Sequence, residues 1–160
     1  RHKAHYAQIR AFYLLRTVRG YIRMKVNINI YSCAGGENSR FCTEGELMRT
    51  PEGFIVNYSL DGDGCSLECR GFTVTQRRSG KLTLLMKFEE GENSECILSE
   101  GGAKFIIPVF TRTVAAVCGE EGCRVTLLYE QGEEREQTEL VFVAERRRER
   151  DAKRKPAPRA

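Results

Sequence analysis

The sequence predicts an all-β domain folded as an antiparallel up-and-down β-barrel. From Met24 onward, apolar and polar residues alternate with a period of two, which is typical of half-buried strands. Short segments of this kind recur about every 8–12 residues and are separated by turn-forming residues. Between residues 24 and 145 no helical stretch of respectable length interrupts them, which excludes βαβ folds. About 8–10 such strands leave no open sheet edge if they close into a barrel.

The first strand contains the alternating residues Val26, Ile28 and Ile30 and ends before the turn at residues 35–38. Turn residues such as Gly, Pro, Asn and Asp separate the segments that follow. Those further segments are, in order, Phe41–Arg49, Phe54–Leu60, Cys65–Cys69, Phe72–Arg77, Leu82–Phe88, Glu95–Ser99, Lys104–Val117, Arg124–Glu130 and Thr138–Ala144. The segment Lys104–Val117 is too long for one straight strand, and Pro108 within it predicts an edge or a bend.

Charge divides the chain into three parts. Residues 1–23 carry six basic and no acidic residues, and residues 146–160 carry eight basic and two acidic ones. The body, residues 24–145, holds the other 12 basic and 20 acidic residues, a net charge of −8. We therefore expect a basic extension (1–23), a barrel domain (24–145) and a basic, disordered tail (146–160). The acidic body would repel nucleic acid, which argues against a nucleic-acid binder that uses the whole protein.

The basic extension has an amphipathic helical pattern, with Arg16, Arg19 and Arg23 opposite an apolar face. An Arg-rich helix without acids is typical of a transit peptide or a membrane-surface anchor. The interpretation that we favour is that Met24 is the natural start and that residues 1–23 are foreign to the fold. No apolar stretch in the sequence approaches the roughly 18 residues of a membrane-spanning helix.

The seven cysteines predict reduced thiols in a cytoplasmic protein, because their number is odd. The pairs Cys65/Cys69 and Cys118/Cys123 have loose zinc-ligand spacings. However, Cys65 and Cys69 would lie about 13 Å apart along one extended strand, too far to share a metal. The turn Asp61–Gly64 resembles the start of a calcium loop, but Phe72 stands where the closing Glu should be. We therefore expect no metal and no cofactor, and interpret the cysteines as small buried apolar residues.

Catalytic groups are sparse. Both histidines, His2 and His5, lie at the N-terminus, so no histidine in the body can activate a Ser or Cys nucleophile. Carboxylates for acid–base catalysis would have to come from Glu44, Glu46, Glu68 or Glu130, and no spacing singles out a pair. The sequence therefore predicts no catalytic residue and a protein that is not an enzyme.

Several short strand and turn motifs resemble the YwiB-like family of small bacterial proteins. The motifs are, in order, Thr43-Glu44-Gly45, Phe54-x-Val56-x-Tyr58, Val74 followed by Arg78-Ser79-Gly80, Met86-x-Phe88-x-x-Gly91, and Leu127-x-Tyr129. The resemblance covers about Met24–Ala144 and implies a calycin-type, lipocalin-like barrel in the bacterial cytoplasm, with no established activity. The chain departs from the family's pattern at residues 99–102 and near Thr138.

The candidate ligand-binding residues are Glu44, Tyr58, Arg78 and Tyr129, which are polar or amphipathic and lie in the motifs above. If the barrel contains a cavity, the Arg and the Tyr hydroxyls could hold an anionic head group while apolar neighbours take its chain. The alternative, favoured because small barrels are usually filled by large side chains, is that the tyrosines belong to the core and Arg78 to a turn.

The function expected from the sequence is non-enzymatic binding of a small molecule or a protein partner. The barrel interior would take a small amphipathic or anionic ligand. The alternative is an interaction protein whose basic ends contact RNA or an anionic membrane. The sequence leaves the oligomeric state open.

Overall fold

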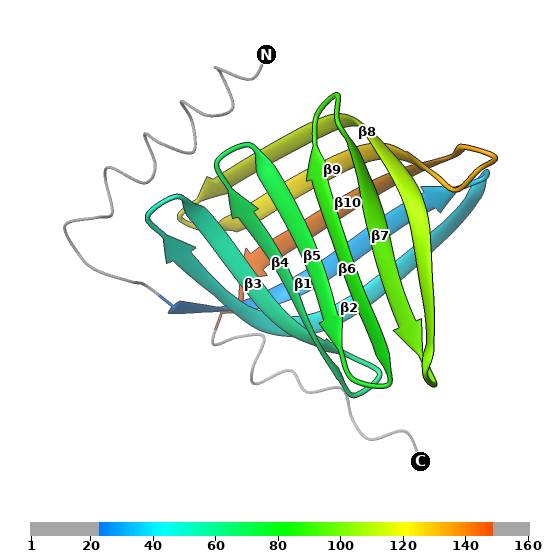
Figure 1. Ribbon diagram of the computed structural model, residues 1–160. Coiled ribbons are helices and arrows are strands. Elements are labelled where there is room, and N and C mark those ends of the chain that lie inside the picture. The colour runs from blue at the N-terminus through cyan, green and yellow to red at the C-terminus, as the bar shows by residue number, and fades with distance from the viewer. Residues whose placement is uncertain (1–22, 149–160) are drawn as a thin grey trace.

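The computed structural model describes residues 23–148, which form a closed barrel of ten antiparallel strands without a helix in this range (Figure 1). The strands are β1 (Arg23–Ala34), β2 (Glu37–Thr50), β3 (Gly53–Leu60), β4 (Asp63–Arg70), β5 (Thr73–Ser79), β6 (Leu82–Glu89), β7 (Asn93–Glu100), β8 (Ala103–Gly119), β9 (Gly122–Gln131) and β10 (Glu136–Arg146). The predicted antiparallel up-and-down barrel is confirmed. The expected helix in residues 1–23 lies outside the described residues, apart from Arg23, which begins β1. The expected disordered tail, residues 146–160, also lies largely outside them, but its first residue, Arg146, is the last residue of β10, and residues 147 and 148 are described too.

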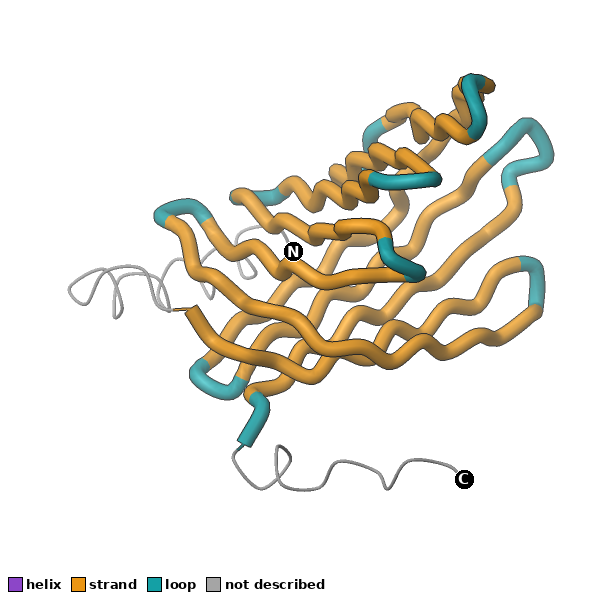
Figure 2. Tube along the Cα trace, turned by 90° about the horizontal axis from the view of Figure 1, so that it is seen from below, coloured by secondary structure: helices purple, strands orange, loops and turns teal. Residues whose placement is uncertain are grey.

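Each strand pairs with its neighbours in sequence, and β1 pairs with β10 to close the barrel. Ile28 marks the closure, because it lies opposite Thr43 on β2 and opposite Ala144 on β10. Short turns join the strands, as the tube view shows (Figure 2). Between β1 and β2 the turn is Gly35–Gly36, with φ angles of +56° and +83°. Two consecutive positive φ values are what a two-residue hairpin turn requires, and glycine adopts them without strain.

The core consists of the inward-facing residue of each alternating pair. On β1, for example, Met24, Val26 and Ile28 are buried while Lys25 is exposed. The largest fully buried side chains are the phenylalanines Phe54, Phe88 and Phe142. Burying such a side chain contributes about 1.5–3 kcal/mol, so the alternation itself specifies which face of each strand turns inward.

The long segment around Pro108 is one strand, β8, with an irregularity in its pairing. Pro108 lies opposite Glu95 of β7, and its carbonyl accepts a hydrogen bond from the Gly132 amide at 2.9 Å. The register with β9 shifts between Thr111 and Thr113. This β-bulge, rather than the proline, is where the alternation of β8 slips, so that Thr111 and Val114 both face inward.

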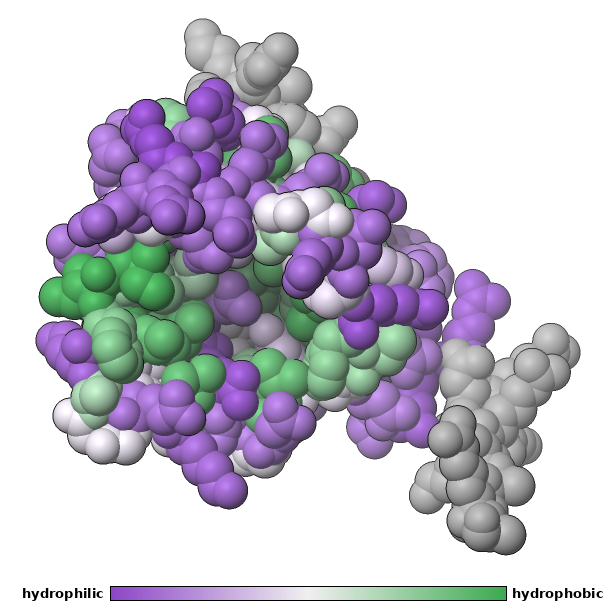
Figure 3. Space-filling view, turned by 90° about the vertical axis from the view of Figure 1, so that its right-hand side faces the viewer, coloured by the Kyte–Doolittle hydropathy of each residue, from purple (hydrophilic) through white to green (hydrophobic). Residues whose placement is uncertain are grey.

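The barrel has two distinct ends. We call the end formed by the β1–β2, β3–β4, β5–β6, β7–β8 and β9–β10 turns the mouth; it lies toward the lower right of Figure 1. The opposite end carries the remaining turns, the start of β1 and the end of β10. Seen from the side of the mouth, the surface is hollowed at its centre, with apolar residues along one side of the opening (Figure 3). The inward-facing residues nearest the mouth therefore lie closest to this hollow.

Candidate functional site at the barrel mouth

Polar side chains face the interior from three neighbouring strands on one wall of the barrel. Tyr58 of β3 lies opposite Cys65 of β4, and Cys65 lies opposite Arg78 of β5. Gln76, two positions before Arg78 on β5, faces the same way. We call Tyr58, Gln76 and Arg78 the arginine wall. All three belong to strands whose other inward positions are apolar, such as Val74, so they are exceptions to the core pattern.

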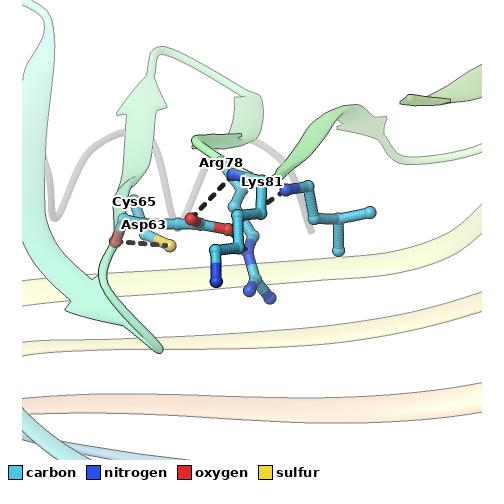
Figure 4. A network of polar contacts seen from close by, with 5 residues as sticks. Asp63, Cys65, Arg78 and Lys81 are labelled. Atoms are coloured by element: carbon cyan, nitrogen blue, oxygen red, sulfur yellow. Dashed lines mark hydrogen bonds and ion pairs between the residues drawn. The ribbon is translucent and has the colours of Figure 1, made fainter. Parts of the chain in front are cut away.

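Asp63 holds Arg78 in place at the start of β4 (Figure 4). Its carboxylate accepts a hydrogen bond from Arg78 Nε at 2.8 Å and from the backbone amides of Lys81 at 2.9 Å and Leu82 at 3.3 Å. The Asp63 side chain is only 5% exposed and that of Arg78 is 20% exposed. The hydrogen bond from Arg78, followed by those from the two amides, lowers the pKa of the Asp63 carboxyl below its usual value. Asp63 is therefore ionised and ties the β3–β4 turn to the β5–β6 turn.

The terminal nitrogens of Arg78 remain available. Asp63 engages only the Nε atom of Arg78. Within residues 23–148, neither Nη atom makes a hydrogen bond or an ion pair. The outer edge of a guanidinium group presents two parallel N–H donors that match a carboxylate or a phosphate. Arg78 is thus fixed through one edge of its guanidinium group, and the donors of the other edge are not engaged by described residues.

Tyr58 lies beside this guanidinium. Burial, followed by the neighbouring Cys65 thiol, raises its pKa to about 12, although Gln76 and Arg78 oppose the shift. Its ring packs against Phe142 of β10 at a centroid distance of 5.7 Å. The phenol is consequently neutral at physiological pH, and its hydroxyl can donate or accept a hydrogen bond.

A second polar row lies on the opposite wall, across β8, β9 and β10. Tyr129 lies opposite Thr111 on one side and opposite Thr138 on the other. All three are at most 6% exposed, and the Tyr129 ring packs on Phe88 at 4.9 Å. Burial raises the pKa of Tyr129 to about 12. We call this set the threonine row.

The four residues predicted as ligand-binding are not all brought together. Tyr58 and Arg78 share the arginine wall, and Tyr129 faces the interior from the opposite wall. Glu44 lies on the outer surface, where its carboxylate pairs with Arg147 Nη1 at 3.1 Å. The paired positions explain this, since Thr43 and Gly45 face inward on β2 and Glu44 between them must face outward.

Gln76, Thr111 and Thr138 were not identified from the sequence. A signal for them exists, because each occupies an inward position in an alternating segment. Thr111, for example, continues the series Ile107-x-Val109-x-Thr111. A polar residue on the apolar face of a predicted strand was the pattern to look for.

Five of the seven cysteines are buried, which fits their interpretation as small apolar side chains. Cys69, Cys118 and Cys123 lie near one another toward the end opposite the mouth, where Arg49 donates a hydrogen bond to the Gly119 carbonyl. Burial raises the pKa of all three thiols. In the part of the chain that the structure describes, no three His, Cys, Asp or Glu side chains are arranged to hold a metal ion.

Comparison with known proteins relates the chain to one solved structure. The crystal structure of the ywiB protein from Bacillus subtilis superimposes with a TM-score of 0.68 at 14% sequence identity, covering 80% of this chain and 94% of that chain. No family model matches the sequence, and no curated protein matches it. The similarity shows a shared barrel fold. Among the described residues, no helix is long and apolar enough to span a membrane.

Proposed function

We propose that this protein is a non-enzymatic β-barrel of the YwiB-like, calycin-type class that binds a small amphipathic anion at its mouth. The anionic group would lie on the terminal nitrogens of Arg78, beside the neutral hydroxyl of Tyr58. The resemblance of the sequence motifs and the common fold with the ywiB protein support the family assignment. A cytoplasmic location follows from the same resemblance and is part of the proposal.

The observation that carries the proposal is the asymmetric pairing of Arg78. An arginine with a purely structural role would be expected to direct its terminal nitrogens to protein acceptors or into water. Here one carboxylate fixes Nε, and both Nη atoms stay unpaired on a side chain that is only 20% exposed. Preorganised donors of this kind bind a carboxylate, sulfonate or phosphate without further ordering of the side chain.

Apolar residues continue the same row beyond Arg78. Arg78 lies opposite Leu84 on β6, Leu84 opposite Leu98 on β7, and Leu98 opposite Phe105 on β8. Phe105 is 53% exposed at the mouth. A charged group next to a strip of apolar side chains suits a ligand with an anionic head and an apolar body.

The chemistry of the arginine wall supports binding rather than catalysis. The nucleophile nearest to Arg78 is Cys65, and burial raises the pKa of its thiol despite the nearby guanidinium. Tyr58, with its raised pKa, is equally poor as a base at neutral pH. The histidines of the chain lie at positions 2 and 5, outside the described residues.

Two fluorescent probes test the proposal. The first, 1-anilinonaphthalene-8-sulfonate, is an amphipathic anion, and the second, N-phenyl-1-naphthylamine, is its uncharged analogue. We expect the anion to bind more tightly, and Arg78→Gln to weaken the anion about tenfold with little effect on the neutral probe. Arg77→Gln is the matched control, because Arg77 faces outward and pairs only loosely with Glu68 at 3.9 Å. Equal binding of both probes, or equal effects of the two substitutions, would refute the proposal.

The alternative function, contact with RNA or an anionic membrane through the basic ends, involves mostly residues outside 23–148. Of the described residues near the C-terminus, Arg147 pairs with Glu44 at 3.1 Å and Arg148 lies 3.8 Å from Glu121. These contacts place acids of the barrel against the start of the basic tail. The structure therefore gives no specific support to this alternative.

A further inference from the structure

Two buried hydroxyl groups of the threonine row have no partner. Thr111 is 0% exposed and Thr138 is 4% exposed, and neither Oγ1 atom makes a hydrogen bond with the described residues. The Thr138 hydroxyl lies near the Tyr129 phenol and lowers its pKa, against the larger effect of burial, but the Thr138 Oγ1 atom meets the geometric criteria for a hydrogen bond with no described residue. A buried hydroxyl without a partner lowers stability, because the group has lost its hydrogen bonds to water.

The inward positions next to these threonines are apolar. The inward residues that flank Thr111 on β8 are Val109 and the partly buried Val114, and the one that follows Thr138 on β10 is Leu140. Valine has nearly the shape of threonine and would fill either position without the penalty. Two unpaired hydroxyls on either side of a third, that of Tyr129, therefore point to an occupant that supplies the missing partners.

We propose that the threonine row is a second polar subsite of the barrel, and that the ligand carries a neutral hydrogen-bonding group, such as a hydroxyl or a carbonyl, separated by an apolar segment from its anionic group. This inference rests on the proposed function. The order of strands around the barrel places β9 directly across from β4, so the threonine row faces the arginine wall across the interior. A ligand with a polar group at each end and an apolar middle would place one end on the arginine wall and the other on the threonine row, with its middle against the apolar side chains of the interior.

The chemistry of the row indicates that this second group is neutral. Thr111, Tyr129 and Thr138 carry no charge, and burial holds the Tyr129 phenol in its neutral form with a pKa of about 12. The ring of Phe88 and the thiol of Cys96 are its further neighbours. A second charge at this position would be buried without a counter-charge, which is strongly unfavourable.

The stability of the free protein provides the first test. We expect Thr111→Val and Thr138→Val each to raise the melting temperature, because each removes an unpaired buried hydroxyl. Thr43→Val is the matched control, since Thr43 is an inward threonine whose hydroxyl donates to the Ser59 carbonyl at 3.3 Å, and its loss should lower the melting temperature. A lower melting temperature in the Thr111 and Thr138 variants would show that bound water already satisfies these hydroxyls, and would overturn the inference.

Binding provides the second test. We would compare ω-hydroxy fatty acids of six to twelve carbons with the plain fatty acids of the same lengths by titration calorimetry. At one or more lengths, wild-type protein should prefer the hydroxy acid about five- to tenfold, and the Thr111→Val/Thr138→Val double variant should lose that preference while still binding the plain acid. The absence of a preference at every length, or its persistence in the double variant, would overturn the subsite. Arg78→Gln separates the two proposals. If this substitution leaves the affinity for the plain fatty acids unchanged, the proposed function fails. If it weakens the binding of the plain acids but wild-type protein shows no preference for the hydroxy acids, only the subsite is refuted.

Discussion

Asp63 and Arg78 meet inside the mouth of the barrel, where Arg78 Nε donates a hydrogen bond to the Asp63 carboxylate at 2.8 Å. Asp63 is the first residue of β4 and Arg78 lies near the end of β5, so the contact joins two successive hairpin turns. The same carboxylate accepts the amides of Lys81 and Leu82. One acidic side chain therefore both shapes the mouth and orients the arginine on which we propose that a ligand binds.

Asp63→Asn should change how stability depends on pH. The pKa of Asp63 is lowered in the folded protein from its ordinary value of 3.8, mainly by the hydrogen bond from Arg78. A carboxyl group whose pKa is lowered by folding stabilises the folded protein at pH values above its unfolded-state pKa. This stabilisation is lost as the pH falls through the folded-state pKa. The melting temperature of wild-type protein should therefore decrease as the pH is lowered below about 4. That of Asp63→Asn should be lower at pH 7 and should fall less on acidification.

Asp61→Asn is the control for this measurement, because Asp61 lies exposed in the β3–β4 turn and asparagine tolerates its φ of +50°. Melting curves by circular dichroism between pH 2.5 and 7 provide the comparison. If Asp63→Asn and Asp61→Asn behave alike across this range, the Asp63–Arg78 contact does not stabilise the folded protein.

Gly80→Ala should destabilise the protein through the same carboxylate. A Cβ atom at position 80 would overlap the Asp63 side chain, which must then give up its hydrogen bonds or move the turn. We expect a loss of about 1–3 kcal/mol in the free energy of unfolding, the usual cost of overpacking. Gly64→Ala should cost much less, because the nearest atom to a Cβ there is the Ser79 carbonyl oxygen at 3.9 Å. Urea unfolding measures both, and equal losses would contradict the role given to Gly80.

The architecture of the barrel follows from local features of the sequence, and so it could be predicted. Residues such as Val26 and Ile28 alternate with polar neighbours, and glycines such as Gly35 end the strands. Neither signal depends on distant residues. The β-bulge at Thr111 and Thr113 could not be predicted, because it depends on how β8 pairs with β9.

The site was only partly accessible from the sequence because it depends on pairings between strands. Arg78 next to Ser79 and Gly80 has the pattern of a turn residue, and only its pairing with Cys65 and its contact with Asp63 place it inside the barrel. Glu44 has the chemistry of a ligand-binding residue, but the parity of β2 directs it outward. The pairing of distant strands therefore decided which polar residues share the interior.

The cysteines should differ sharply in their reactivity. Cys42 is exposed, whereas Cys69, Cys118 and Cys123 are buried and have raised thiol pKa values because burial disfavours the thiolate. At pH 8, iodoacetamide should modify Cys42 within minutes and leave the three buried thiols unmodified until the protein unfolds. Peptide mapping by mass spectrometry identifies the modified positions. Rapid modification of Cys123 in folded protein would show that the end opposite the mouth opens in solution.

The tyrosines of the two walls should titrate late. Burial raises the pKa of both Tyr58 and Tyr129 from 10.0 to about 12. Because the folded-state pKa is the higher one, the stability that the neutral phenols confer is complete below pH 10 and is lost between about pH 10 and 12. The absorbance of tyrosinate at 295 nm should show two of the six tyrosines ionising in this upper range while circular dichroism still reports a folded barrel.

Tyr58→Phe and Tyr129→Phe should each remove one of these late transitions. In guanidinium chloride all six should ionise together near pH 10, which provides the reference. A single transition near pH 10 in folded protein would mean that water reaches both phenols, and the interior would then be more open than the ring contacts of Phe142 and Phe88 indicate.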